Sequence, residues 1–146
     1  MSRQGASIVI KRPPEEVFAY MDDVAREKEW QPNLSSATRD PAGPTQVGTK
    51  KRYVSSFLGN DLTNTYVVQE LDVGRRIVYE TTSDSAISAS NEITCEGVEG
   101  GTKVTMIIGG KPKGVLRLVP RAVLETTYKD QLKTTLRRLK KCLEGS

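Results

Sequence analysis

The stretch SIVIKRPPEEVF, residues 7–18, decides how this chain begins to fold. Ile8 and Ile10 lie on the same side of an extended segment, which predicts a strand. Pro13 and Pro14 then predict the start of a helix, because proline fits the first helical turn, where its missing N–H group is not needed. The predicted elements are a strand at Ala6–Arg12 and a helix at Pro13–Asp22.

Downstream of these two elements, the sequence predicts a meander of antiparallel strands. Between Thr38 and Lys111, turn residues recur about every ten positions without an intervening helical pattern, which is typical of an antiparallel sheet. Gly59-Asn60-Asp61 is a strong hairpin signal. The predicted strands are Gly48–Leu58, Leu62–Leu71, Arg76–Thr82, Ile87–Glu96 and Thr102–Ile108.

Two further helices are predicted around this sheet. A short one lies within Asp22–Pro32, and a long one covers Val115–Glu144, where Pro120 either begins or kinks the regular helix. Apolar residues recur along the long helix at spacings of four and three, which predicts one face packed on the sheet. These residues are Leu124, Tyr128, Leu132, Leu136, Leu139 and Leu143. The fold class is therefore α+β, and we expect one domain over residues 1–146.

The space between the long helix and the sheet is where a binding site would lie, because the inward-facing side chains are modest in size. Hydroxyl and amide groups in an apolar wall are typical of a small-molecule pocket. The alternative is a filled core in which these groups bond to each other or to buried water. We predict a ligand pocket lined by Trp30, Tyr53, Phe57, Asn64, Tyr66, Tyr79, Asn91, Ile93, Met106, Leu124 and Tyr128. Two roles stay open for Trp30: a lid that contacts the ligand, or a plug that seals the core.

The 146 residues include no histidine, which removes the most common general base and metal ligand. Carboxylates and two distant cysteines make a poor ligand set for zinc or iron. We therefore predict no metal, no cofactor and no catalytic residue. Lys51 and Glu70 both face inward by strand alternation, and we expect them at the rim, with the lysine ammonium at the mouth. A Lys51–Glu70 pair that transfers a proton is the alternative.

The net charge of +4 comes largely from basic residues in Lys133–Lys141 and just before the long helix. No aromatic residues are interleaved with them, so nucleic-acid binding, and DNA binding above all, is not expected. A solvated basic face that complements the helix dipole is the simpler explanation, and an acidic partner for this helix is the alternative. The segment Gly109–Gly114 departs from the phosphate-loop consensus and is expected to be a flexible basic connector.

Cellular location can be predicted only from what the chain lacks. Cys95 and Cys142 have no metal-type spacing and are expected to be free thiols in a reducing compartment. No apolar run is long enough to cross a bilayer, and Met1–Ser7 has no apolar signal-peptide core. We therefore expect a cytoplasmic protein.

Several stretches resemble, in the right order along the chain, the START-like or SRPBCC superfamily with the Bet v 1-like helix-grip fold. They are residues 10–18, Asp22-Asp23, Trp30-Gln31-Pro32, Val47-Gly48-Thr49, Gly100–Thr105 and the ending Leu136–Glu144. Within the superfamily, the chain is similar to the bacterial polyketide cyclase/dehydratase and lipid-transport branch. The resemblance implies a seven-stranded antiparallel sheet curved around the C-terminal helix, with two small helices closing one end. Members bind lipids, sterols, polyketides, quinones or plant hormones between sheet and helix, and some are cyclases or hydrolases.

Three functions follow from the residues and the resemblance together. The first is carriage or sequestration of a small hydrophobic ligand such as a lipid, polyketide or quinone. The second is a cyclase/dehydratase-type enzyme in which tyrosine hydroxyls and pocket shape steer a reactive polyketone. The third is a protein- or RNA-interaction module that uses the basic segment Lys133–Lys141.

Overall fold

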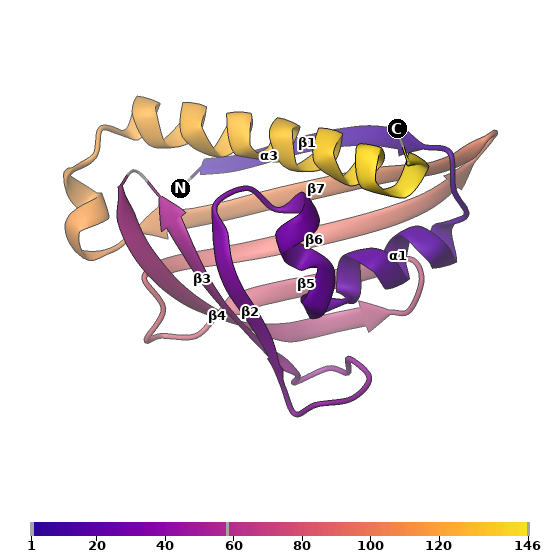
Figure 1. Ribbon diagram of the computed structural model, residues 1–146. Coiled ribbons are helices and arrows are strands. Elements are labelled where there is room, and N and C mark those ends of the chain that lie inside the picture. The colour runs from indigo at the N-terminus through magenta and orange to yellow at the C-terminus, as the bar shows by residue number, and fades with distance from the viewer. Residues whose placement is uncertain (1, 58, 146) are drawn as a thin grey trace.

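The computed structural model describes residues 2–57 and 59–145 of the chain (Figure 1). In this part of the chain, the strands form one antiparallel sheet of seven strands in the order β1-β7-β6-β5-β4-β3-β2. The strands are β1 (Ser2–Ile10), β2 (Leu34–Asp40), β3 (Lys50–Phe57), β4 (Asn60–Asp72), β5 (Arg76–Thr81), β6 (Ile87–Val98) and β7 (Gly101–Pro112). The predicted seven-stranded antiparallel sheet is confirmed.

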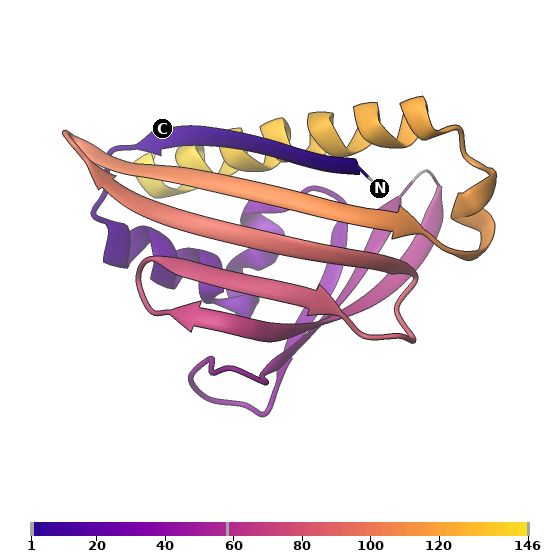
Figure 2. The same cartoon turned by 180° about the vertical axis from the view of Figure 1, so that it is seen from behind.

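The helices all lie on one face of the curved sheet. Seen from behind, the strands lie in front of every helix, so the outer face of the sheet is uncovered (Figure 2). The helices are α1 (Pro14–Asp22), α2 (Glu27–Trp30) and the long α3 (Arg121–Glu144), with 3₁₀ turns η1 (Val24–Arg26) and η2 (Gly114–Leu118). This arrangement is the helix-grip fold, as predicted. None of the helices in the described residues is both long and apolar enough to cross a bilayer.

Prolines fix where the two longer helices start. Pro14 occupies the first turn of α1, followed by Glu15 and Glu16, whose charges favour the positive end of the helix dipole. Pro120 is the N-cap of α3, so the predicted start at Val115 is wrong. Proline disfavours helical geometry in the residue before it, and the preceding segment forms the separate turn η2.

The segment between α1 and β3 is more broken than the sequence predicts. The expected helix within Asp22–Pro32 is divided into η1 and the four-residue α2. The Asp23 side chain accepts a hydrogen bond from the Ala25 N–H group at 3.0 Å, which starts η1 as a tight turn. Strand β2 begins before the predicted alternation at Thr38. Its start was not predicted because the sequence LSSATRD has too few apolar residues to show a strand pattern.

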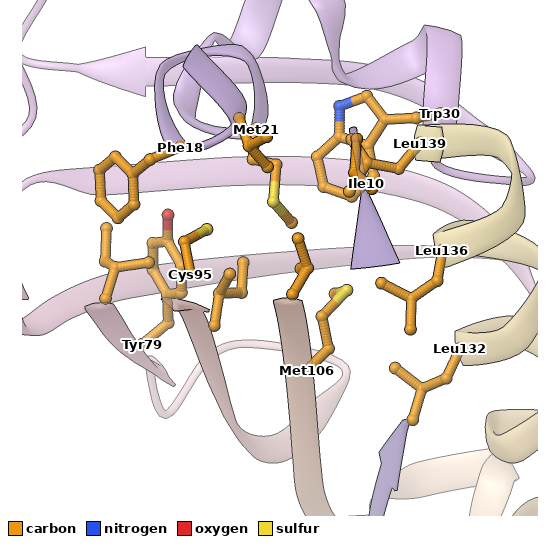
Figure 3. Close-up of a cluster of buried hydrophobic side chains, with 14 of the residues drawn as sticks. Ile10, Phe18, Met21, Trp30, Tyr79, Cys95, Met106, Leu132, Leu136 and Leu139 are labelled. Atoms are coloured by element: carbon orange, nitrogen blue, oxygen red, sulfur yellow. The ribbon is translucent and has the colours of Figure 1, made fainter. Parts of the chain in front are cut away.

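The main core lies between α1, the C-terminal half of α3 and the inner face of the sheet (Figure 3). Leu132, Leu136 and Leu139 project from α3 toward the sheet, which confirms the predicted apolar face. Trp30 and Ile10 lie beside Leu139 and are almost fully buried. The remaining buried members are Val17, Phe18, Met21, Val68, Ile77, Tyr79, Ile93, Cys95, Val104 and Met106.

A second and much smaller apolar cluster lies under the N-terminal half of α3. Its buried members are Leu124 of α3 and Ile87 of β6, with Leu62, Ala89, Val119 and Tyr128 partly buried around them. The two halves of the same helix are thus packed differently. The C-terminal half rests on a filled core, whereas the N-terminal half has few large side chains beneath it.

Gly101 is the point where β7 passes closest to the end of β1. A Cβ atom at this position would lie 2.1 Å from the carbonyl oxygen of Ile10, which is backbone and cannot move aside freely. At Gly97, by contrast, the nearest neighbour of a new Cβ would be Pro14 Cγ at 3.5 Å, an ordinary contact.

We expect Gly101→Ala to destabilise the fold by about 1–3 kcal/mol, because the added methyl group forces β1 and β7 apart. Thermal unfolding would measure the loss, with Gly97→Ala as the matched control that leaves the melting temperature nearly unchanged. Equal melting temperatures for the two variants would contradict the close approach of Gly101 to β1.

Candidate ligand-binding cavity

A cavity of about 660 Å³ lies between the inner face of the sheet and the N-terminal half of α3. Side chains from α2, from strands β2 to β7 and from α3 form its wall. The volume is within the range of sites that hold a small organic molecule. The cavity occupies the region where the second apolar cluster leaves space unfilled.

The structure brings the predicted pocket residues together around this cavity. The lining includes Trp30, Tyr53, Asn64, Tyr66, Tyr79, Asn91, Ile93, Met106, Leu124 and Tyr128. The eleventh predicted residue is Phe57, whose side chain lies outside what the structure describes. That these residues contact a ligand stays a prediction.

Three tyrosines form a row across neighbouring strands of the cavity wall. The rings of Tyr53 and Tyr66 meet edge to face with centroids 5.7 Å apart, and those of Tyr66 and Tyr79 with centroids 6.2 Å apart. Such contacts fix the ring orientations, since edge-to-face packing is the favoured arrangement of aromatic pairs. The row gives β3, β4 and β5 a rigid surface toward the cavity.

Lys51 is not at the cavity rim, and the prediction that it places its ammonium at the mouth is wrong. Its side chain is fully buried, and its Nζ lies 2.7 Å from Asp22 Oδ1. The Nζ also donates to the Tyr79 hydroxyl at 2.9 Å. Asp22 Oδ1 further accepts a hydrogen bond from Thr45 at 3.0 Å. Lys51 faces inward as predicted, but a carboxylate from α1 neutralises it inside the protein.

Strand alternation also predicts the wrong face of the sheet for Glu70. A register shift between Val68 and Glu70 inserts one extra residue in β4 and reverses which side chains face inward. Glu70 is therefore exposed and pairs with Arg76 at 2.7 Å, while Leu71 packs against the core. The Lys51–Glu70 pair considered from the sequence does not form.

A buried acid that lines the cavity, Glu27 of α2, was not predicted from the sequence. Its side chain is 1% exposed, and its Oε1 accepts a hydrogen bond from the Tyr53 hydroxyl at 2.9 Å. Its other oxygen, Oε2, accepts from the Gln31 side-chain amide. A signal was present, because Glu27 lies three residues before Trp30 and thus on the same face of a short helix. Strand alternation could not reveal it.

Burial dominates the acid–base properties of this group. It raises the pKa of Glu27 to about 7, although Lys51 and the hydrogen bonds from Tyr53 and Gln31 pull the pKa down. Burial also raises the pKa of Tyr53 and of Tyr79 well above the ordinary value, and the charge of Glu27 adds to both shifts. Burial therefore places the pKa of Glu27, an acid of the cavity wall, near neutrality.

Two polar atoms of the cavity wall are buried without a partner. Among the described side chains, the buried atoms that make no hydrogen bond are Trp30 Nε1, Asn91 Oδ1 and Arg39 Nε. The first two belong to residues that line the cavity. Asn64, by contrast, is satisfied, since its Oδ1 accepts from the Ile87 N–H group at 3.1 Å. The wall therefore offers one free donor, on Trp30, and one free acceptor, on Asn91. Trp30 packs in the main core, as the plug role requires, and also lines the cavity. Its contact with a ligand stays a prediction.

The cavity lining includes three basic residues, one of which, Arg121, pairs with Glu125 at 2.9 Å. Lys111 of β7, Arg117 of η2 and Arg121 of α3 all belong to its lining. A flexible connector was expected at Gly109–Gly114. The structure contradicts this for Gly109–Lys111, which is the paired end of β7. Among the described residues, no group of three or more His, Cys, Asp or Glu side chains is arranged to hold a metal ion.

Comparison with protein families places almost the whole chain in one of them. Residues 3–144 match the model of the family described as polyketide cyclase/dehydrase and lipid transport. No curated protein matches the chain.

Solved structures share the fold over nearly their full length. A protein from Thermus thermophilus is 15% identical with a TM-score of 0.84, covering 99% of this chain and 98% of its own. An aromatase/cyclase from a Streptomyces strain is 16% identical with a TM-score of 0.82, covering 98% and 93% respectively. A START superfamily protein from Mycobacterium smegmatis is 12% identical with a TM-score of 0.80, covering 98% and 97%. At these identities the likeness shows the fold alone.

The raised pKa of Glu27 predicts a specific pH dependence of stability. Because the folded-state pKa is about 7 and the ordinary value is 4.5, the folded protein holds a proton that the unfolded chain releases between these values. The contribution of Glu27 is therefore most favourable below its ordinary pKa and is lost as the pH rises toward about 7. Between about pH 5 and about pH 8, the free energy of unfolding of wild type should fall by on the order of 2–3 kcal/mol relative to that of Glu27→Gln. Urea unfolding of both proteins at the two pH values would measure this difference, and parallel pH profiles would contradict it.

Proposed function

We propose that this chain, which belongs to the polyketide cyclase/dehydrase and lipid transport family, binds a small and largely apolar molecule in the cavity under α3 and carries or sequesters it. The observation that carries this proposal is the cavity itself. Its volume of about 660 Å³ is lined by apolar side chains, aromatic rings and neutral polar groups, together with the charged residues Glu27, Lys111, Arg117, Arg121 and Glu125. Small-molecule sites are typically built in this way.

The two unpartnered atoms of the wall support a ligand with polar groups at defined positions. Leaving a buried donor or acceptor unsatisfied costs about 1–3 kcal/mol, so a ligand that satisfies both gains affinity over a plain hydrocarbon. Trp30 Nε1 requires an acceptor on the ligand, and Asn91 Oδ1 requires a donor. The proposed ligand is therefore an apolar molecule that carries at least one carbonyl or ether oxygen and one hydroxyl or amide group.

A cyclase/dehydrase-type enzyme is the second candidate, and Glu27 is the observation that favours it. A buried acid with a pKa near neutrality, hydrogen-bonded to a tyrosine in the cavity wall, has the properties of a general acid or base. Such a group could move protons on a bound polyketone while the tyrosine row fixes its shape. The family includes such activities by its description.

A blocked cavity tests the binding proposal directly. Ala89 of β6 lines the cavity, and a phenylalanine there would fill part of it, whereas the neighbouring Ser88 is exposed on the opposite face of the strand. After incubation with a lipid and metabolite extract, native mass spectrometry should show a discrete added mass on wild type and on Ser88→Phe. We expect Ala89→Phe to lose this mass or to bind at least about tenfold more weakly, which is about 1.4 kcal/mol. An unmodified mass across a broad extract, or equal binding by both variants, would overturn the proposal.

Removing single hydroxyl groups separates binding from catalysis. In Tyr53→Phe and Tyr66→Phe the rings and their packing remain, so a protein that only binds should keep most of its affinity. An enzyme that relies on these hydroxyls should lose roughly 10²-fold or more in rate. The measurement is the rate of product formation from a poly-β-ketone substrate, compared with binding of the same compound. Turnover that is absent in wild type would remove the second candidate.

A further inference from the structure

Glu27 is a carboxyl group that the fold buries in the cavity wall. It belongs to α2, is 1% exposed, and accepts hydrogen bonds from Tyr53 on one oxygen and from Gln31 on the other. Both donors also line the cavity. The group is therefore held in one orientation by residues that a bound ligand would touch.

Among the described residues, Glu27 has no salt-bridge partner. In the described part of the chain, no lysine or arginine nitrogen pairs with its carboxylate within 4.0 Å, although eight other such pairs form. Lys51 of β3 is the cation that acts on it, but Asp22 of α1 already neutralises that lysine at 2.7 Å.

The remaining elements packed around the group present both neutral and charged side chains. Tyr53 of β3 and Tyr79 of β5 face it from the sheet. On α3, the neutral lining residues are Leu124, Tyr128, Gln131, Leu132 and Thr135, and the charged ones are Arg121 and Glu125, which pair with each other at 2.9 Å. Arg138 of α3 donates to the backbone carbonyls of Lys28 and Glu29 on α2. Asp22 adds a second negative charge nearby and opposes ionisation of Glu27. Lys51, Tyr53 and Gln31 favour the charged form of Glu27, but burial outweighs them and its pKa is raised.

We propose that Glu27 makes this cavity selective for uncharged ligands with a carbonyl-type oxygen, which it binds in its protonated form by donating the carboxyl proton to that oxygen. The inference rests on the proposed binding function and names the ligand class. A ligand that fills the cavity removes water from beside Glu27, and loss of water disfavours the charged carboxylate. Binding is thus coupled to uptake of a proton by those molecules in which Glu27 is ionised before the ligand binds.

The hydrogen-bond geometry explains why the ligand needs an acceptor. A protonated carboxyl group has one O–H donor. Tyr53 and Gln31 both donate to Glu27 in this structure, and while they do so neither takes that proton, so the cavity is where a partner for it can lie. A hydrocarbon would leave the O–H group unsatisfied. A ketone, ester or amide oxygen satisfies it.

The size of the pH effect follows from the fraction of protein that holds the proton. Because the pKa of Glu27 is about 7, roughly nine-tenths of the protein is protonated at about pH 6 and one-tenth at about pH 8. If only the protonated form binds, the apparent Kd rises as that fraction falls. Affinity for an uncharged ketone should therefore be about tenfold weaker at the higher pH.

The test uses two fluorescent probes that are uncharged over this range: prodan, which carries a ketone, and pyrene, which has no polar atom. Wild type should bind prodan about tenfold more tightly at about pH 6 than at about pH 8. Glu27→Gln keeps a neutral donor and should bind prodan tightly with no pH dependence. Glu29→Gln, on the same helix but bonded to Tyr20 at the surface, is the matched control and should keep the wild-type profile.

Glu27→Leu separates the proton donor from the cavity volume. At about pH 6 it should bind prodan several-fold more weakly than wild type while its affinity for pyrene does not fall. Prodan affinity that is equal at both pH values in wild type would overturn this inference and leave the proposed binding function standing. A cavity that takes up neither probe at either pH would overturn the binding function, and this inference with it.

Discussion

The constraint on which the structure depends is the gap between one straight helix and a curved sheet. A helix of 24 residues spans about 36 Å, and the sheet curves away beneath it. Contact can therefore be close only along part of the helix, unless large side chains fill the rest. This chain fills one half and not the other. Leu132, Leu136 and Leu139 meet α1, Trp30 and the sheet, whereas Leu124 and Tyr128 face a sparsely filled space. The cavity is the consequence.

Buried charge is treated in two different ways at the α1–α2 end of this space. Lys51 is completely enclosed but has a carboxylate at 2.7 Å, a tyrosine hydroxyl and a backbone carbonyl as partners. A buried pair of this kind is satisfied and acts as a structural tie between α1 and β3. Glu27 is equally buried but has only neutral hydrogen-bond donors, and burial outweighs the attraction of Lys51, so its pKa is raised. The first arrangement holds the fold together, and the second leaves a group whose protonation responds to what enters the cavity.

Much of the sheet side of the cavity wall could be predicted from the sequence because strands alternate regularly. Tyr53, Asn64, Tyr79 and Asn91 were identified by position alone, since every second residue of an antiparallel strand faces the same layer. The same rule failed at Glu70, where a bulge in β4 adds a residue that has no signature in the sequence.

Features that depend on contacts between distant segments could not be predicted. The partner of Lys51 comes from α1, which lies 29 positions away in the chain. The depth of Glu27 depends on how a four-residue helix is pressed between β2 and α3. The break of the last helix at Pro120 was foreseen as one of two outcomes, but the turn before it required the structure. Alternation and periodicity describe which face a residue takes, whereas burial depends on what covers that face.

The distribution of aromatic residues has a consequence for spectroscopy. The chain has five tyrosines and one tryptophan, and Tyr53, Tyr66, Tyr79, Tyr128 and Trp30 all line the cavity. Only Tyr20 lies elsewhere, hydrogen-bonded to Glu29 near the surface. Nearly every chromophore that absorbs in the near ultraviolet is thus in one place, in an asymmetric and largely rigid setting. The near-ultraviolet circular dichroism of this protein is therefore a spectrum of its cavity, and a change of occupant would alter it while the far-ultraviolet signal of the backbone stays constant.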